Sequence, residues 1–403
     1  MSINYFILKK IWEYLPFDIE SKSELNRESR EKKKNYEDKY HLNETINWLC
    51  RAQDSANDKG VSRAYKASKY KGFGPYGWQA SYPETTGYII PTMIAAAEYM
   101  NDDYLKQRAR DMADWEIQIQ MPTGAVMGSV VTAIPSPAVF NTGQVIFGWL
   151  AVYRETNEQK YVDASKRAGD YLLSVQDING LFDSGDSKFA LKGATTYNAR
   201  VAWALAELGV VTGEKKYREA ACKNIENALR KQNHKGWFAD NCLNDPEKPL
   251  LHTIVYTTRG VLETGILLNE PRYISAAIKT LDALLACQRP DGGIPGRLDK
   301  DWASKADWDC LTGDAQASIA WLRAHSITSE PKYKSAARKA IDFVKKTQNL
   351  THKNPGIRGG VKGSFPFDAE YGQFELLNWA AKFFCDALMM INDDSIAKKG
   401  IKG

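Results

Sequence analysis

A pattern that recurs every 56 to 60 residues constrains the fold of this chain more than any other feature. In five copies, a tyrosine opens a charged segment and a glutamine closes it. The tyrosines are Tyr104, Tyr161, Tyr217, Tyr273 and Tyr333. The closing glutamines are Gln120, Gln176, Gln232, Gln288 and Gln348, with an earlier one at Gln53. A glycine follows at Gly124, Gly180, Gly236 and Gly292. Because glycine commonly ends a helix, each copy predicts a charged helix that stops at a tight turn.

Apolar segments alternate with these charged helices. They span residues 86–100, 141–153, 197–211, 253–268, 313–325 and 371–390. A helix that is apolar on all sides must be buried, whereas an amphipathic helix covers it from outside. Six buried and six half-exposed helices predict an inner and an outer ring, which is an all-α, six-hairpin (α/α)6 barrel with minimal β structure.

Three regions follow from this pattern. Residues 41–393 form the predicted toroid, preceded by a charged N-terminal arm at 1–40 and followed by a C-terminal tail at 394–403. The stretch 21–39 is dense in charge and nearly free of apolar residues, which is typical of a solvated arm. The apolar patch 5–17 packs either on the barrel or on a second subunit, so a homo-oligomer held through the arm stays open.

Composition and charge limit which partners and which cellular compartment we expect for this protein. The net charge of +5 is modest, and no Lys/Arg cluster with interleaved aromatics occurs in the folded part, so we expect no nucleic-acid partner. The N-terminus lacks the features of a signal peptide and no stretch is long enough to span a membrane. We therefore predict a cytoplasmic protein, with periplasmic or cell-surface action left open. Six scattered cysteines without a CxxC motif indicate reduced core thiols.

The repeat also aligns positions on the inner helices. One register holds Tyr88, Gln144, Arg200, Tyr256 and Gln316, and one turn nearer the helix start lie Glu84, Phe140, Thr196, His252 and Thr312. Buried polar groups cost free energy unless they are paired. A ring of them at helix starts favours a pocket at one mouth of the barrel, although mutual pairing inside a core remains an alternative. The next turn is mostly apolar and predicts a closed floor.

The loops before the inner helices should line that mouth, and they are rich in glycine and aromatics, as in 72–78, 82–87, 307–310 and 365–367. Aromatic rings beside carboxylates and amides suit sugar rings, while the alternative is that they cap the core. The predicted substrate-binding residues are Tyr88, Glu84, Gln144, Tyr197, Asn198, Arg259, Trp308, Asp314, Gln316, Trp78 and Tyr371.

Four segments carry a resemblance to a known group of proteins. YPETTGYIIP, FNTGQVIFGWL, HTIVYTTRGVLE and CLTGDAQASIAWLR resemble a family of toroid proteins encoded with bacterial surface-polysaccharide genes, over roughly 43–393. The hairpin count and polar mouth are also similar to the six-hairpin polysaccharide lyases and glycoside hydrolases. The resemblance implies an enzyme for an acidic polysaccharide or oligosaccharide of the O-antigen or exopolysaccharide kind. It says less about the reaction, because function resides in the site.

The motif His252–Tyr256–Arg259 places three polar side chains on one helix face. Cleavage of a uronate polymer by β-elimination needs a base for the C5 proton, an acid for the leaving oxygen and a donor that neutralises the carboxylate. The resemblance to toroid lyases implies a catalytic set of Asn141, His252, Tyr256 and either Arg200 or Arg259, of which Arg200 is the better candidate for the carboxylate. Glu263 lies one turn after Arg259 and favours an ion pair there. We therefore predict a uronate-directed polysaccharide lyase that needs neither cofactor nor metal.

Other functions remain open. A six-hairpin glycoside hydrolase would pair two carboxylates from Glu84, Asp314, Asp309 and Glu375. A uronate C5-epimerase would share the base chemistry of the lyase, and a sugar-binding toroid would lack catalysis. An isoprenoid toroid with zinc at 307–310 is discounted, because no further His or Cys is suitably placed.

Overall fold

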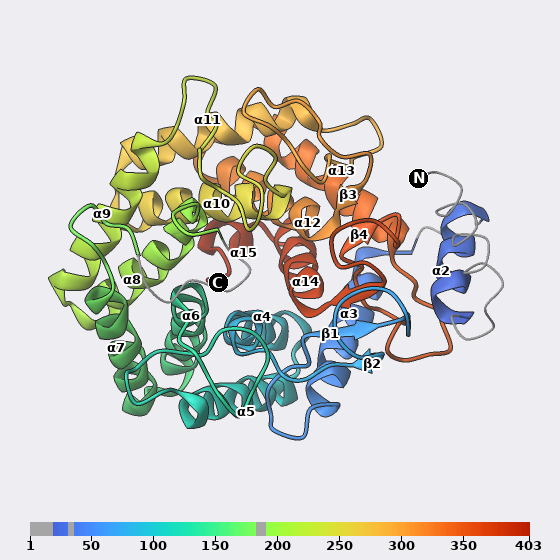
Figure 1. Cartoon of the computed structure of the whole chain (residues 1–403), viewed down its shortest axis with the longest axis horizontal. Helices are drawn as coiled ribbons and strands as arrows, with labels where there is room; N and C mark the ends of the chain where they lie inside the picture. The colour runs from blue at the N-terminus through green and yellow to red at the C-terminus, as the bar shows by residue number, and fades with distance from the viewer. Residues whose placement is uncertain (1–18, 31–35, 183–190) are drawn as a thin grey trace.

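Two concentric rings of helices make up the computed structural model, which describes residues 19–30, 36–182 and 191–403 (Figure 1). The inner helices are α4 Pro83–Met100, α6 Val139–Thr156, α8 Ala199–Thr212, α10 Leu251–Leu268, α12 Leu311–Thr328 and α14 Asn378–Asn392. The outer helices are α3 Asp38–Asp54, α5 Asp103–Ile119, α7 Gln159–Ser174, α9 Lys215–Arg230, α11 Pro271–Cys287 and α13 Pro331–Thr347. Each inner helix packs on the next and α14 packs on α4, so the ring closes. The predicted (α/α)6 barrel is confirmed.

The β structure is confined to short loop strands. β1 Ala64–Lys66 lies between β2 Gly77–Trp78 and β5 Glu375–Leu377 in an antiparallel sheet, with Tyr65 opposite both Trp78 and Leu376. β3 Asp309–Cys310 pairs with β4 Ser364–Phe365. The β1–β5 pairing joins the loop before the first inner helix to the loop before the last one, which fixes the mouth where the ring closes.

The repeated glutamine links neighbouring hairpins. Gln232 Nε2 donates to Gly236 O at 3.3 Å in its own loop and to Ala276 O at 2.9 Å on the next outer helix. The same double contact recurs at Gln120, Gln176 and Gln288. The repeat period is therefore the signature of a contact between hairpins.

The repeated glycine is required by the same junction. Gly292 has φ +102°, and a β-carbon there would lie 2.1 Å from the Lys339 carbonyl oxygen of the next outer helix. Only glycine allows the backbone this conformation and this approach.

The repeated tyrosine connects consecutive outer helices. Tyr217 donates through its hydroxyl to Asp170 at 2.8 Å, and Lys216 pairs with the same carboxylate at 2.5 Å. Equivalent pairs join Tyr161 to Asp114, Tyr273 to Glu226 and Tyr333 to Asp282. In the first copy, by contrast, Tyr104 is exposed and its hydroxyl accepts from Arg108.

The two ends of the described chain pack on the barrel. In the arm, α2 Ile19–Arg30 places Glu24 and Glu28 against Lys362 at 3.0 and 2.6 Å. The apolar patch 5–17, on which the homo-oligomer expectation rests, lies outside the described residues. The predicted tail forms α15 Asp394–Lys399 and then reaches the centre of the inner ring (Figure 1). Within the described ranges, no helix is both long and apolar enough to cross a lipid bilayer.

The glycine junction gives a stability prediction. Gly292→Ala should lower the free energy of unfolding by about 3 kcal/mol, because the left-handed backbone costs an alanine ~1–2 kcal/mol and overpacking costs ~1–3 kcal/mol more. Gly213→Ala is the control, since Gly213 has φ +75° but no neighbouring atom within 4 Å of the place a β-carbon would take. It should cost only about 1 kcal/mol. Chemical unfolding measures both, and equal losses would contradict the close approach.

Candidate active site

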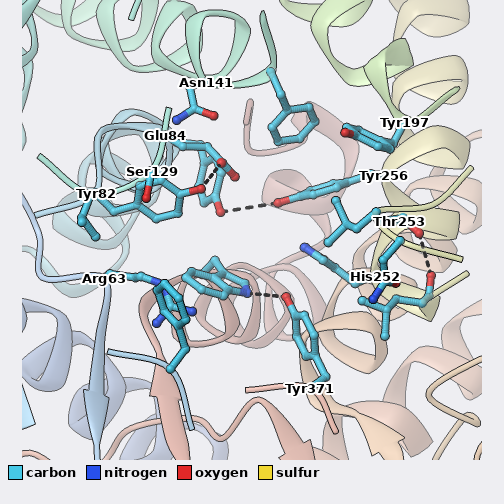
Figure 2. A pocket seen from close by; sticks show the side chains of 18 of the residues that line it. Arg63, Tyr82, Glu84, Ser129, Asn141, Tyr197, His252, Thr253, Tyr256 and Tyr371 are labelled. Carbon is cyan, nitrogen blue, oxygen red and sulfur yellow. Dashed lines mark hydrogen bonds between the residues drawn. The ribbon is translucent and has the colours of Figure 1, made fainter. Parts of the chain in front are cut away.

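A cavity of about 440 Å³ opens at the mouth where the inner helices begin (Figure 2). Seven predicted site residues line it, namely Glu84, Tyr88, Asn141, Tyr197, His252, Tyr256 and Tyr371. Other lining residues were not among the predicted site residues, and they include Arg63, Ser129, Arg297, Glu370 and Trp379. The predicted pocket at the helix starts therefore exists, but loops supply much of its wall.

His252 lies in the first turn of α10 and is held in one orientation. Its Nδ1 lies 2.9 Å from Gln316 Oε1, so Nδ1 carries the proton and donates it, while Nε2 keeps its lone pair. Burial lowers the pKa of His252 to about 4, against the hydrogen bond to Gln316. The ring is therefore neutral at pH 7. Gln316, predicted to bind substrate, instead orients His252 and does not line the cavity.

Tyr256 lies one turn after His252, with the two rings 4.3 Å apart. Its hydroxyl donates to the Tyr88 hydroxyl at 3.4 Å, so two phenols meet in the cavity (Figure 2). Burial raises the pKa of both phenols, and the nearby charge of Arg200 opposes that rise. Both hydroxyls therefore carry their protons at neutral pH.

Arg200 lies beneath these phenols and does not line the cavity. Its guanidinium carbon is 4.8 Å from the Tyr256 ring centre and 5.6 Å from that of Tyr88. Phe147, Trp203 and Phe383 complete an aromatic cage around it. Its Nε donates to Gln144 Oε1 at 2.6 Å, while both Nη atoms are buried without a hydrogen-bond partner among the described residues. Arg200, predicted to bind the substrate carboxylate, and Gln144, predicted to bind substrate, therefore pair with each other and do not line the cavity.

Glu84 lies in the first turn of α4, where the Tyr82 hydroxyl donates to it at 2.7 Å. Burial raises the pKa of Glu84 to about 7, against the hydrogen bond from Tyr82 and the charges of Arg200 and Arg63. A carboxyl group poised near neutrality can give or take a proton at physiological pH.

An aromatic wall with an arginine faces Glu84 across the cavity (Figure 2). The Trp379 indole donates to the Tyr371 hydroxyl at 2.9 Å. Arg63 lies 5.2 Å from the Trp379 ring centre, and its Nη1 donates to Glu375 at 3.1 Å. Glu375, a predicted hydrolase carboxylate, is therefore paired behind the wall and does not line the cavity. Aromatic rings beside charged groups in a cavity wall suit a saccharide.

Arg259 is part of the barrel floor. It lies 3.7 Å from Glu263, as its spacing predicted, and donates to the carbonyl oxygens of Ile401 and Gly403 at 2.6 and 3.2 Å. Arg323 completes the group with a 2.8 Å contact to Glu263. Arg259, predicted to bind substrate, does not line the cavity, because a further turn of α10 separates it from the mouth.

The other predicted binding residues lie away from the cavity. Asp314 accepts from the Ile294 backbone N–H at 3.0 Å, and Asp309 pairs with Arg289 at 2.7 Å. Of the four carboxylates considered for hydrolysis, only Glu84 lines the cavity. Within the described ranges, no three His, Cys, Asp or Glu side chains gather as metal ligands.

Two aromatic residues and one asparagine that were predicted to bind substrate also lie outside the cavity. Trp78 packs 5.1 Å from Trp48, and Trp308 is buried beside Gly296. Asn198 ends a 3-10 turn before α8 and lines a separate cavity of about 10 Å³. Some aromatic loop residues thus lie in the core and others line the cavity. The composition of the loops alone did not show which residues would do which.

Comparisons with known proteins support the fold. No protein-family model matches the sequence, and no curated protein is significantly similar to it. Among solved structures, an unsaturated glucuronyl hydrolase specific for heparin shares 14% identity at a TM-score of 0.69, covering 90% of this chain and 100% of that one. The unsaturated glucuronyl hydrolase of Bacillus sp. GL1 shares 12% identity at 0.69, covering 89% and 97%. Cellobiose 2-epimerase of Bacillus thermoamylovorans shares 12% identity at 0.68, covering 88% and 98%. At such identities the similarity establishes a shared toroid fold.

The burial of His252 predicts that the free energy of unfolding falls in acid. The pKa of His252 is about 4 in the folded protein, whereas its ordinary value is 6.5. Between pH 6.5 and pH 4 this histidine therefore binds a proton in the unfolded chain more readily than in the folded protein. Stability should therefore fall as the pH drops from 6.5 to 4, by about 3 kcal/mol for this group. His252→Gln should remove that share of the loss, measured by chemical unfolding at pH 7 and pH 4.

The exposed His234 provides the control. His234→Gln should leave the loss between pH 7 and pH 4 unchanged. Burial also lowers the pKa of His41 to about 4, so part of the loss persists in either variant. An unaltered pH dependence in His252→Gln would contradict the neutral, buried state of the ring.

Proposed function

We propose that this protein is an enzyme that acts on an acidic saccharide by proton transfer to His252 and from Tyr256, with Glu84 binding the substrate. The observation that carries the proposal is the His252–Gln316 hydrogen bond of 2.9 Å, which leaves Nε2 as a base beside the Tyr256 phenol. The aromatic wall of the same cavity supports a sugar ring as the ligand. The toroid neighbours include enzymes named for glucuronyl hydrolysis and cellobiose epimerisation, which also favours a saccharide.

β-Elimination uses this set of residues most fully. His252 Nε2 takes the C5 proton, and the electrons of the C5–H bond form a C4–C5 double bond while the C4–O bond breaks. Tyr256, whose raised pKa keeps it protonated, donates its proton to the leaving oxygen. The C5 proton is acidic only if the neighbouring carboxylate is neutralised. Arg63 and Arg297 line the cavity and can do this, whereas Arg200 acts only through the phenols above it.

A glycoside hydrolase is the second candidate, and the raised pKa of Glu84 favours it. A carboxyl group with a pKa of about 7 is protonated often enough to act on a glycosidic oxygen. Hydrolysis by paired carboxylates needs a partner for Glu84, and Glu370 is a second carboxylate that lines the cavity. A C5-epimerase would share the base chemistry of the lyase and reprotonate C5 without breaking the C4–O bond.

The reaction products distinguish these possibilities. We expect incubation with acidic bacterial surface polysaccharides to give fragments that absorb in the ultraviolet and lack the mass of one water relative to hydrolysis products. His252→Ala and Tyr256→Phe should each lower kcat about 10²- to 10⁴-fold with an unchanged circular dichroism spectrum. Tyr217→Phe, in the outer ring, is the matched control and should retain activity.

Several outcomes would overturn β-elimination. Products that carry an added water and no absorbance would favour hydrolysis. Exchange of solvent deuterium into C5 without chain cleavage would favour epimerisation. Full activity in His252→Ala would exclude this histidine as the base.

Glu84 provides a separate test through pH. If its protonated form stabilises the substrate carboxylate, kcat/KM should fall as the pH rises through about 7, because the carboxyl then loses its proton. Glu84→Gln donates a hydrogen bond but cannot titrate, so it should stay within about tenfold of the parent and lose that alkaline fall. Glu158→Gln, on the outer surface, should leave the profile unchanged.

The same variant separates the two leading reactions. As the general acid of a hydrolase, Glu84 would be essential, and Glu84→Gln would lose about 10²- to 10⁴-fold in kcat. A pH–rate profile of both proteins on the active substrate provides the measurement.

A further inference from the structure

Arg297 and Glu370 form a forked ion pair in the wall of the cavity. Arg297 Nη2 donates to Glu370 Oε1 at 2.6 Å and Nε donates to Oε2 at 3.2 Å. The third nitrogen, Nη1, donates to the Lys248 carbonyl oxygen at 2.7 Å, which anchors the guanidinium to the backbone. Two parallel N–H···O contacts are the geometry in which arginine recognises a carboxylate.

The two partners differ sharply in exposure. The Arg297 side chain is 5% exposed, whereas that of Glu370 is 55% exposed. A buried guanidinium needs an anionic partner, because leaving it unpaired costs free energy. A half-exposed carboxylate, in contrast, can return to water at little cost. Another carboxylate can therefore replace Glu370 on Arg297, while Arg297 cannot readily move away.

The pair also lies beside the proposed base. Leu250 pairs with Arg297 across a β-bridge, and the Leu251 N–H donates to the Gly296 carbonyl at 2.9 Å. These contacts fix Arg297 next to the first turn of α10, where His252 lies. Glu370 directly precedes Tyr371, whose ring is 5.7 Å from that of His252. A carboxylate held on Arg297 would therefore lie on the same side of the cavity as His252.

We propose that Arg297 is the carboxylate-binding residue of this cavity and that Glu370 competes with a uronate carboxylate for its fork. The proposal rests on the proposed function only in that a saccharide enters the cavity. The expected ligand carries a carboxylate on the sugar ring. A neutral sugar cannot displace Glu370 from a charged fork, so the pair selects acidic over neutral saccharides.

Binding measured without turnover tests this assignment. The probes are D-glucuronate and methyl glucoside, titrated against the full chain and followed by ligand-observed NMR. Glu370→Gln should tighten glucuronate binding about 3- to 10-fold, because it removes the competing charge while keeping the size of the side chain. Arg297→Gln should weaken glucuronate binding about 10- to 100-fold, the range expected for a lost charge-assisted hydrogen bond. Neither change should alter the weak binding of methyl glucoside.

Matched variants separate the charge of Arg297 from its forked geometry. Asp301→Asn removes the ion pair of Asp301 with Lys235 outside the cavity and should not change binding. Arg297→Lys keeps the charge without the fork, so it should bind glucuronate less tightly than the parent but more tightly than Arg297→Gln. If Arg297→Gln fails to fold, the Arg297→Lys and Glu370→Gln pair still decides the matter.

Two results would overturn the proposal. Unchanged or weaker glucuronate binding in Glu370→Gln would mean that the pair holds the loop or that Glu370 is a catalytic carboxylate. Unchanged glucuronate binding in Arg297→Lys would place the carboxylate elsewhere. Because no turnover is measured, tighter binding in Glu370→Gln would stand even if the products showed no double bond.

Discussion

The contact between each closing glutamine and the next outer helix is the constraint on which the barrel depends. One amide group bonds at once to its own loop and to the neighbouring hairpin, so the spacing of hairpins is set locally and repeated. The loop that leaves this junction continues to the start of an inner helix. An error in the junction would therefore displace the helix starts, and with them the side chains of the cavity. The glycine behind the amide makes the contact feasible, because a β-carbon would collide with the neighbouring backbone.

Beneath the cavity, the barrel holds several charges in an apolar setting. The cage around Arg200 consists of aromatic rings, and its two Nη atoms have no hydrogen-bond partner among the described residues. Deeper down, burial lowers the pKa of Arg259 to about 10 and that of Lys382 to about 7. Lys382 lies 2.6 Å from Asp386, and Arg259 faces Glu263. Such burial is costly, and it leaves the Arg200 guanidinium beside the rings of Tyr88 and Tyr256. A positive charge at that place favours negative charge on the two phenols above it.

The cavity thus combines two kinds of support. Inner helices hold His252, Tyr256 and Glu84, the groups to which the proposal gives proton transfer and substrate binding. Loops hold the charged groups of the cavity wall, since Arg63, Arg297 and Glu370 all lie between helices. Rigid elements give the helix-borne groups fixed geometry, while loops give the charged groups of the wall more freedom to move, as the proposed exchange of carboxylates on Arg297 requires.

The repeat determined the ring, because the same junction recurs in the chain with one spacing. It also identified the register of Glu84, Tyr88, His252 and Tyr256, which all line the cavity. It could not show that Arg200, in the same register, is covered by the rings of Tyr88 and Tyr256, since that depends on how side chains from opposite helices fill the barrel. Nor could it find Arg63, Arg297 and Glu370, which have no periodic position. Their places depend on pairing between loops far apart in sequence, and only the closed tertiary structure brings those loops together.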